Sequence, residues 1–119
     1  MKQYVISLAL LIAALVAFLT SYANAQSQPE MNRQAAKDFE KADTELNKTY
    51  EALLRKLPDA EGKEKLKQSQ RAWLTFRDAE AAFASDQARG GSMAPIIRYE
   101  TMTELTKQRI RQLKLHLEE

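Results

Sequence analysis

Glycine and proline stand at only three places in this chain, and they divide most of it into long uninterrupted segments. The chain has three residues of each type. Pro29 lies alone, and the other five fall within two short stretches, LPDAEGKE at 57–64 and RGGSMAP at 89–95. Because these two residue types interrupt helices and mark turns, the pattern predicts three helical segments after the first 25 residues.

The first and third segments carry apolar residues at spacings of three and four, the period of an amphipathic helix and not of a strand. In the first segment the apolar stripe is Ala35, Phe39, Ala42, Leu46, Tyr50, Leu53 and Leu57. In the third segment the stripe is Tyr99, Met102, Thr106, Ile110, Leu113 and Leu117, with threonine as its one polar member. The sequence therefore predicts an all-α fold, a small three-helix bundle that runs up, down and up.

Short polar residues at the start of each segment predict where the helices begin. Ser27 with Glu30 three residues later has the pattern of a capping box, with Pro29 tolerated in the opening turn. Asp59 is the expected N-cap of the second helix and Ser92 that of the third.

The first 25 residues, MKQYVISLALLIAALVAFLTSYANA, have the pattern of a secretory signal peptide. Lys2 precedes an apolar run over residues 4–19, and small residues near position 25 suit a cleavage site. Sixteen helical residues reach about 24 Å, against a hydrocarbon core of about 30 Å, so cleavage after Ala25 is expected rather than a membrane anchor. The expected organisation is a signal peptide at 1–25 and a helical domain at 26–119, in the periplasm or outside the cell.

The composition of the expected mature chain limits its partners. Removing 25 of the 119 residues leaves 94, and the loss of Lys2 leaves 17 basic against 16 acidic side chains, a net charge of about +1. This balance gives little attraction to nucleic acid or to an anionic membrane, so neither is an expected partner. The basic residues of the third segment lack interleaved aromatic residues and are expected to form its solvated face; they are Lys107, Arg109, Arg111 and Lys114. The sequence indicates no particular oligomeric state.

Metal and cofactor chemistry finds no support in the residue types present. The chain has no cysteine, and His116 is its one histidine. Structural zinc and disulfide bonds are therefore not expected, and helix packing must supply the stability. His116, near the C-terminus, suits the negative end of a helix dipole.

The second segment mixes aromatic and charged residues in the stretch QRAWLTFRDAEAAF at 70–83. The large rings are expected in the core, because so small a domain has few others to fill it; they are Phe39, Tyr50, Trp73, Phe76 and Phe83. Charged and amide side chains share the helix face of these rings.

These polar residues predict a seam inside the bundle. Arg77 lies in register with Trp73, and a buried guanidinium without a partner would cost several kcal/mol. Its expected partners are Asp43 or Asn47 on the first helix, or Glu80 one turn along its own helix. Together with Gln70, they give a predicted seam of Asp43, Asn47, Gln70, Arg77 and Glu80. The alternative is an arginine that binds a partner protein. The internal role is favoured, because charges in the seam of a small bundle more often fix register.

No pattern of catalytic residues stands out, so an enzyme is not expected. Asp78 and Glu80 lie two apart and do not face each other on a helix, which argues against an acid and base pair. The chain also lacks a nucleophile and base pair or a phosphate-binding loop. The best candidate for an exposed contact is the glycine-containing loop, which suits either a plain turn or insertion into a partner's cleft; its residues are Arg89, Gly90, Gly91 and Ser92.

Four stretches together resemble the lysozyme inhibitor LprI-like family of exported bacterial proteins. They are MNRQAAKDFEKADTELNKTY at 31–50, QRAWLTFRDAE at 70–80, GGSMAP at 90–95 and LTKQRIRQL at 105–113. The resemblance implies a secreted or periplasmic, non-enzymatic helical domain that binds and inhibits lysozyme or another peptidoglycan-cleaving enzyme. Many members are domains of unknown function, so the alternative is a cell-envelope interaction module with a different partner.

The resemblance also bears on particular residues. If the loop enters the cleft of a lysozyme, Ser92 and Arg89 would contact the catalytic carboxylates. Family members often carry cysteines directly after the DAE of the second helix and four residues before the Leu-Thr of the third, where this chain has Ala81 and Thr101. The joint absence is what the loss of one disulfide between these helices would leave.

Overall fold

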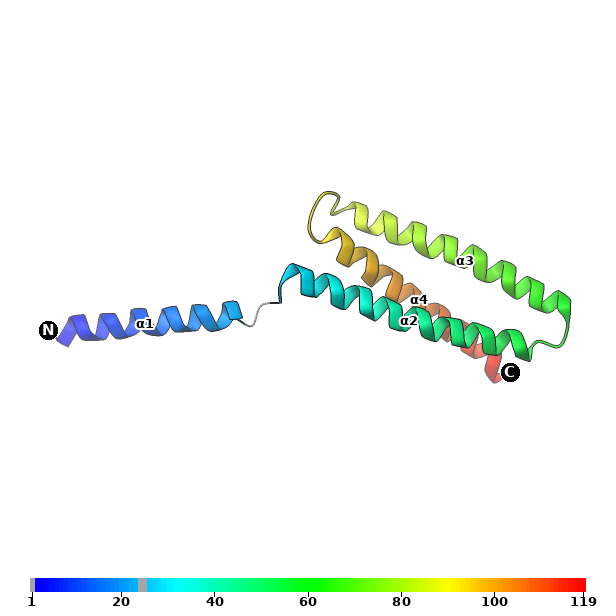
Figure 1. The fold of residues 1–119 in the computed structure, drawn as a ribbon, viewed down its shortest axis with the longest axis horizontal. Helices are drawn as coiled ribbons and strands as arrows, with labels where there is room; N and C mark the ends of the chain where they lie inside the picture. The colour runs from blue at the N-terminus through cyan, green and yellow to red at the C-terminus, as the bar shows by residue number, and fades with distance from the viewer. Residues whose placement is uncertain (1, 24–25) are drawn as a thin grey trace.

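A computed structural model describes the backbone of residues 2–23 and 26–119, and the side chains of residues 8–19 and 26–119. The fold is all-α, with four helices and no strand in these ranges: α1 (Lys2–Ala23), α2 (Gln28–Lys56), α3 (Ala60–Asp86) and α4 (Ala94–Glu118). Figure 1 shows α1 lying apart from the other three helices. Within the described ranges, none of the helices combines the length and hydropathy that a membrane span requires.

The helices α2 and α4 run in the same direction, and α3 returns antiparallel to both (Figure 1). The last helix, α4, packs against both α2 and α3. Contacts at the two ends of the α2–α4 pair fix this arrangement. The Gln28 side chain donates to the Ser92 carbonyl over 2.8 Å at one end, and the Lys56 ammonium donates to the Leu117 carbonyl over 2.8 Å at the other.

Two of the three predicted helix starts are confirmed. The Ser27 hydroxyl accepts from the Glu30 amide over 3.4 Å, and the Glu30 carboxylate accepts from the Ser27 amide over 3.3 Å, so the capping box is complete. The Asp59 carboxylate accepts from the Gly62 amide over 2.7 Å at the start of α3. These caps form because the residues involved lie within one turn of each other.

The prediction of Ser92 as the N-cap of α4 is wrong. Met93 occupies that position, with φ −82° and ψ −17°, and makes no side-chain cap hydrogen bond. A capping side chain needs an extended backbone to reach over the first turn. Here the chain enters α4 already turning, and the Gly91 and Met93 carbonyls accept from the Ala94 and Ile97 amides.

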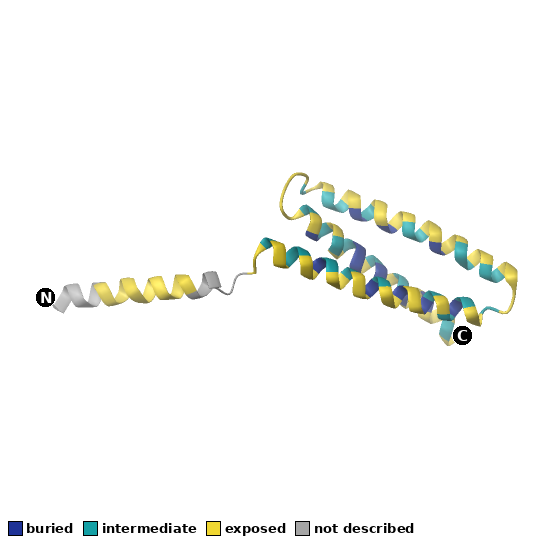
Figure 2. Cartoon of the chain, viewed as in Figure 1, coloured by how far each residue is buried: buried dark blue, intermediate teal, exposed yellow. Residues whose placement is uncertain are grey.

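The hydrophobic core lies mainly between α2 and α4. Its centre is a cluster of Leu46, Leu53, Ile110 and Leu113, against which Tyr50, Leu66, Trp73 and Leu117 pack partly buried. Buried positions line the facing sides of the three packed helices, whereas the described side chains of α1 are all exposed (Figure 2). Residues 26–119 therefore contain the whole described core and fold around it without α1.

The prediction that all large rings lie in the core is wrong for Phe76 and Phe83 on α3. Phe76 is 51% exposed and Phe83 is 69% exposed, whereas Phe39, Tyr50 and Trp73 are half-buried. The helix instead turns Gln70, Arg77 and Ala81 inward. The small side chain of Ala81 lets α3 approach its neighbours closely, and Arg77 finds partners there. The face that packs is therefore a mixed one, which also carries Leu66 and Trp73.

Candidate functional site

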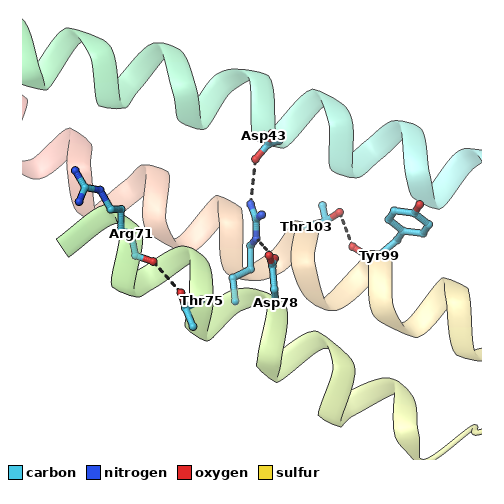
Figure 3. A network of polar contacts seen from close by, with 7 residues as sticks. Asp43, Arg71, Thr75, Asp78, Tyr99 and Thr103 are labelled. Atoms are coloured by element: carbon cyan, nitrogen blue, oxygen red, sulfur yellow. Dashed lines mark hydrogen bonds and ion pairs between the residues drawn. The ribbon is translucent and has the colours of Figure 1, made fainter. Parts of the chain in front are cut away.

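Arg77 is the centre of the buried polar seam. Its Nη1 donates to Asp43 Oδ1 on α2 over 3.0 Å, and its Nε donates to Asp78 Oδ1 over 2.9 Å. Figure 3 shows Asp43 and Asp78 approaching this guanidinium from α2 and α3. The cross-helix pair with Asp43 that the sequence predicts is present. The second acceptor is Asp78, not Glu80.

Aromatic rings complete the surroundings of Arg77. Its guanidinium carbon lies 5.1 Å from the ring centre of Phe39 and 5.3 Å from that of Trp73, within the range of cation–π attraction. Two carboxylates and two rings thus hold a buried charge between α2 and α3. Of the other predicted seam residues, Asn47 is exposed and Glu80 is half-buried, so Asn47 does not belong to the seam.

A second arginine joins α3 to α4. Arg109 donates from Nε to Gln70 Oε1 over 3.1 Å and from Nη2 to Ser69 Oγ over 3.0 Å, and it lies 6.0 Å from the ring centre of Trp73. Partial burial lowers the pKa of Arg109. The prediction that it belongs to the solvated face of α4 is therefore wrong, and sequence reasoning missed it because spacing alone does not reveal Gln70 as its partner.

The loop between α3 and α4 is exposed but tightly turned. The Ala88, Arg89 and Gly91 amides donate to carbonyls three residues earlier, over 2.8 to 3.1 Å. Gly90 has φ +77°, a left-handed conformation that favours glycine. A Cβ at Gly91 would stand 3.1 Å from the Ala88 carbonyl oxygen, so this position also has little room. With the Gln28 bond to the Ser92 carbonyl, these contacts hold the loop in one shape.

Arg89 is fixed at the loop by Asp86. Its Nε and Nη2 donate to the two carboxylate oxygens of Asp86, each over 2.7 Å, and this hydrogen bonding raises the pKa of Arg89. Arginine has five N–H donors in a rigid fork, so the two bonds leave its other edge free to donate. Ser92 is exposed beside it. The four predicted loop residues therefore lie together on one exposed turn.

A groove between α2 and α4 begins next to this loop. Its volume is about 400 Å³, and Met93 of the loop lines it together with Met31, Ala35 and Ile96. Its remaining lining is polar, with three acidic residues and one basic residue among Gln26, Gln34, Asp38, Glu100, Thr103, Glu104 and Lys107. Sequence reasoning missed this groove. The sequence feature that could have indicated it is the pair of apolar residues Met31 and Ile96, which lie outside the two predicted stripes.

The exposed face of α3 is a third surface that sequence reasoning missed. Ala72, Phe76, Ala79 and Phe83 are all exposed and lie on the side of the helix away from its buried residues. Their spacing of four, three and four is the signal that identifies them as one line along the helix. No group of histidine, cysteine or acidic residues within the described part of the chain could hold a metal ion.

These features define a small all-α domain with an exposed, ordered loop beside a groove. Residues 20–113 match the family model described as lysozyme inhibitor LprI. An uncharacterised protein of Rhizobium meliloti (strain 1021) is 38% identical over 102 residues, which cover 76% of this chain and 73% of that relative. No solved structure matches the chain. The chain belongs to the LprI family, and the resemblance seen in the sequence is confirmed.

Proposed function

We propose that this protein is exported, loses residues 1–25, and binds and inhibits a lysozyme in the periplasm or outside the cell. Its family is described by lysozyme inhibition, which is a binding role and not a catalytic one. The N-terminal pattern of Lys2, the apolar run and the small residues before Gln26 supports export.

The observation that carries this proposal is the shape of the 87–93 loop. It is exposed, yet internal turns, the Gly90 conformation and the Gln28 bond hold it in one conformation. A loop that is already ordered loses little entropy when it enters a cleft. Ser92 and the free edge of Arg89 supply donors, and donors are what the catalytic carboxylates of a lysozyme would accept.

The groove beside the loop extends the proposed contact. Asp38, Glu100 and Glu104 stand on its rim with Lys107 as the one basic residue, so the rim is acidic although the expected mature chain has a net charge of about +1. A basic lysozyme surface would be attracted locally by this rim. The apolar floor, with Met93 continuous from the loop, would bury part of the contact.

Lysis of bacterial cell walls by a lysozyme, in the presence of purified residues 26–119, tests the proposal. Inhibition should be saturable, and Ser92→Trp should reduce it at least tenfold without changing the melting temperature, because Ser92 is exposed. The matched control is Leu115→Trp, which adds the same ring at an exposed position far along α4 and should inhibit like the parent.

The contribution of the groove is tested by removing its acidic charge. The triple variant Asp38→Asn, Glu100→Gln, Glu104→Gln should weaken inhibition, most strongly at low salt, since screening reduces surface attraction. The control triple Glu51→Gln, Glu64→Gln, Glu118→Gln makes the same charge change at exposed sites outside the groove. If lysozymes of several structural types are unaffected by a large molar excess of folded protein, the inhibitor proposal fails, and an envelope-binding module with another partner takes its place.

A further inference from the structure

The face of α3 that points away from the bundle carries four exposed apolar residues, Ala72, Phe76, Ala79 and Phe83, here called the α3 outer stripe. Its two phenylalanine rings are 51% and 69% exposed. The groove and Ser92 lie elsewhere, because the groove is lined by α2, α4 and the residues just before them. Exposed rings aligned along one helix form the kind of apolar patch that marks an interaction surface.

The order of residues in the α3 outer stripe is complementary to its own reverse, so that a large residue stands opposite a small one. Large and small residues alternate as alanine, phenylalanine, alanine and phenylalanine. When a second copy of α3 lies antiparallel, Phe76 of each copy faces Ala79 of the other, and Phe83 of each faces Ala72 of the other. Alternation of large and small side chains at facing positions is how packed helices interdigitate.

We propose that the α3 outer stripe is the contact between two copies of this chain, related by a two-fold axis that crosses the stripe midway between Phe76 and Ala79. Such an interface is isologous, with the same patch used by both copies. A parallel arrangement in the same register would instead set ring against ring and leave gaps between the facing alanines. The self-complementary pattern therefore favours a second copy over an unrelated protein.

Charges at the ends of the stripe fit the same arrangement. Lys65 lies at the N-terminal end of the stripe and Asp86 at its C-terminal end, and both are exposed. In the antiparallel pair each Lys65 comes within about 6 Å, measured along the helix, of Asp86 in the other copy. In each copy Asp86 already accepts from Arg89 and Lys65 already pairs with Glu61, so these two contacts would add a weak attraction and would not by themselves fix the register. A parallel pair would place like charges together instead.

The size of the contact sets its strength. From Lys65 to Asp86 the facing helices extend about 33 Å, one helix wide, and a stable interface commonly buries about 800 Å² per partner. A single helix face provides less than this, so the dimer should dissociate on dilution. The dimer should also form without displacing the loop or the groove. If no dimer is found, the proposed inhibition of lysozyme is therefore unaffected.

Sedimentation equilibrium of residues 26–119 over a range of concentrations tests the dimer. The parent should show a monomer–dimer equilibrium, and Phe83→Glu should raise the dissociation constant at least tenfold with an unchanged melting temperature. Leu115→Glu is the matched control, because Leu115 is a similarly exposed apolar residue, at 63%, outside the stripe. A parent that stays monomeric up to millimolar concentration would overturn the proposal, as would a dimer that Phe83→Glu leaves intact.

Single cysteines test the antiparallel register, since the chain has no cysteine of its own. Across the proposed axis, two copies of residue 79 are offset by about 5 Å along the helix and two copies of residue 72 by about 17 Å. Disulfides need Cα atoms within about 7 Å. On mild oxidation Ala79→Cys should therefore give a covalent dimer and Ala72→Cys should not. Equal cross-linking of the two variants, or none by Ala79→Cys, would contradict the antiparallel pair.

Discussion

The two contacts of α4 differ in chemistry. Against α2 it forms an apolar seam in which Leu46 and Leu113 are fully buried. Against α3 the prominent side-chain contacts are polar, with Arg109 donating to Gln70 and Ser69. Apolar burial stabilises a contact in proportion to area, whereas an internal hydrogen bond mainly replaces one to water. The difference teaches that α2 and α4 supply the centre of the apolar core, and that α3 adds Leu66 and Trp73 at its edge together with specific polar pairs.

The largest expected effect is in the apolar seam. Leu46→Ala removes a side chain that is 0% exposed and should lower the free energy of unfolding by about 4 kcal/mol, from lost burial and the cavity left behind. Urea denaturation measures this. Leu115→Ala, on the exposed side of α4, should change the free energy by less than about 0.5 kcal/mol. Similar losses in the two variants would show that the seam is not the dominant source of stability.

A disulfide between α3 and α4 would strengthen the contact between these two helices. The Gln70–Arg109 hydrogen bond sets the alignment of these antiparallel helices. Ala81 lies eleven residues after Gln70, and Thr101 lies eight residues before Arg109. Their positions along the helix axes therefore differ by about 4.5 Å, which is less than one turn. Ala81→Cys with Thr101→Cys should therefore oxidise and raise the free energy of unfolding by about 3 kcal/mol relative to the reduced form. Persistent free thiols in air, measured by a thiol assay, would contradict the register.

Removing the central arginine of the seam should have a smaller effect. Arg77→Ala leaves Asp43 and Asp78 without their partner, but their side chains are 36% and 53% exposed and can be rehydrated. The expected loss is about 2 kcal/mol, between the values for buried and surface ion pairs. Arg71→Ala, at an exposed position of the same helix, is the control for thermal unfolding. A variant at position 77 that melts like the parent but loses a partner would make the seam a binding site.

The smallest effect should come from the loop that joins α3 to α4. Gly90→Val forces a branched residue into a left-handed backbone and should cost about 1 kcal/mol, whereas Gly90→Asn should cost less. Hydrogen exchange should show reduced protection of backbone amides at the end of α3 and unchanged protection around Leu46. Equal loss of protection in the α2–α4 seam would mean that the two contacts unfold together and are not separable.

Features that depend on neighbouring residues could be predicted from the sequence. The apolar stripes of α2 and α4 and the caps at Ser27 and Asp59 are examples, because each rests on residues within one or two turns. The failure of Ser92 to cap α4 could not be predicted in this way. The backbone before α4 depends on the turn of the loop and on Gln28, which lies 64 residues away and holds the Ser92 carbonyl.

The orientation of α3 could not be derived from its own residues. One face offers Phe76 and Phe83, and the other offers Trp73 beside Arg77 and Ala81, so the apolar pattern does not decide which face packs. The choice depends on groups from other helices, since Asp43 compensates the buried charge. The loop residues were found from their glycines, but the groove beside them requires α2 and α4 to be aligned in space.

The parallel arrangement of α2 and α4 has a consequence for the order of folding. The core cluster joins Leu46 and Leu53 to Ile110 and Leu113, residues from the first and the last of the three packed helices. Contacts between residues so far apart in sequence form only after the entropy of closing a long loop has been overcome, and this slows folding. In a chain growing from its N-terminus, the cluster around Leu46 is incomplete until the last helix, which supplies Ile110 and Leu113, has been synthesised. Folding of this domain should therefore follow completion of the chain, and loss of the last helix should leave α2 and α3 without a common core.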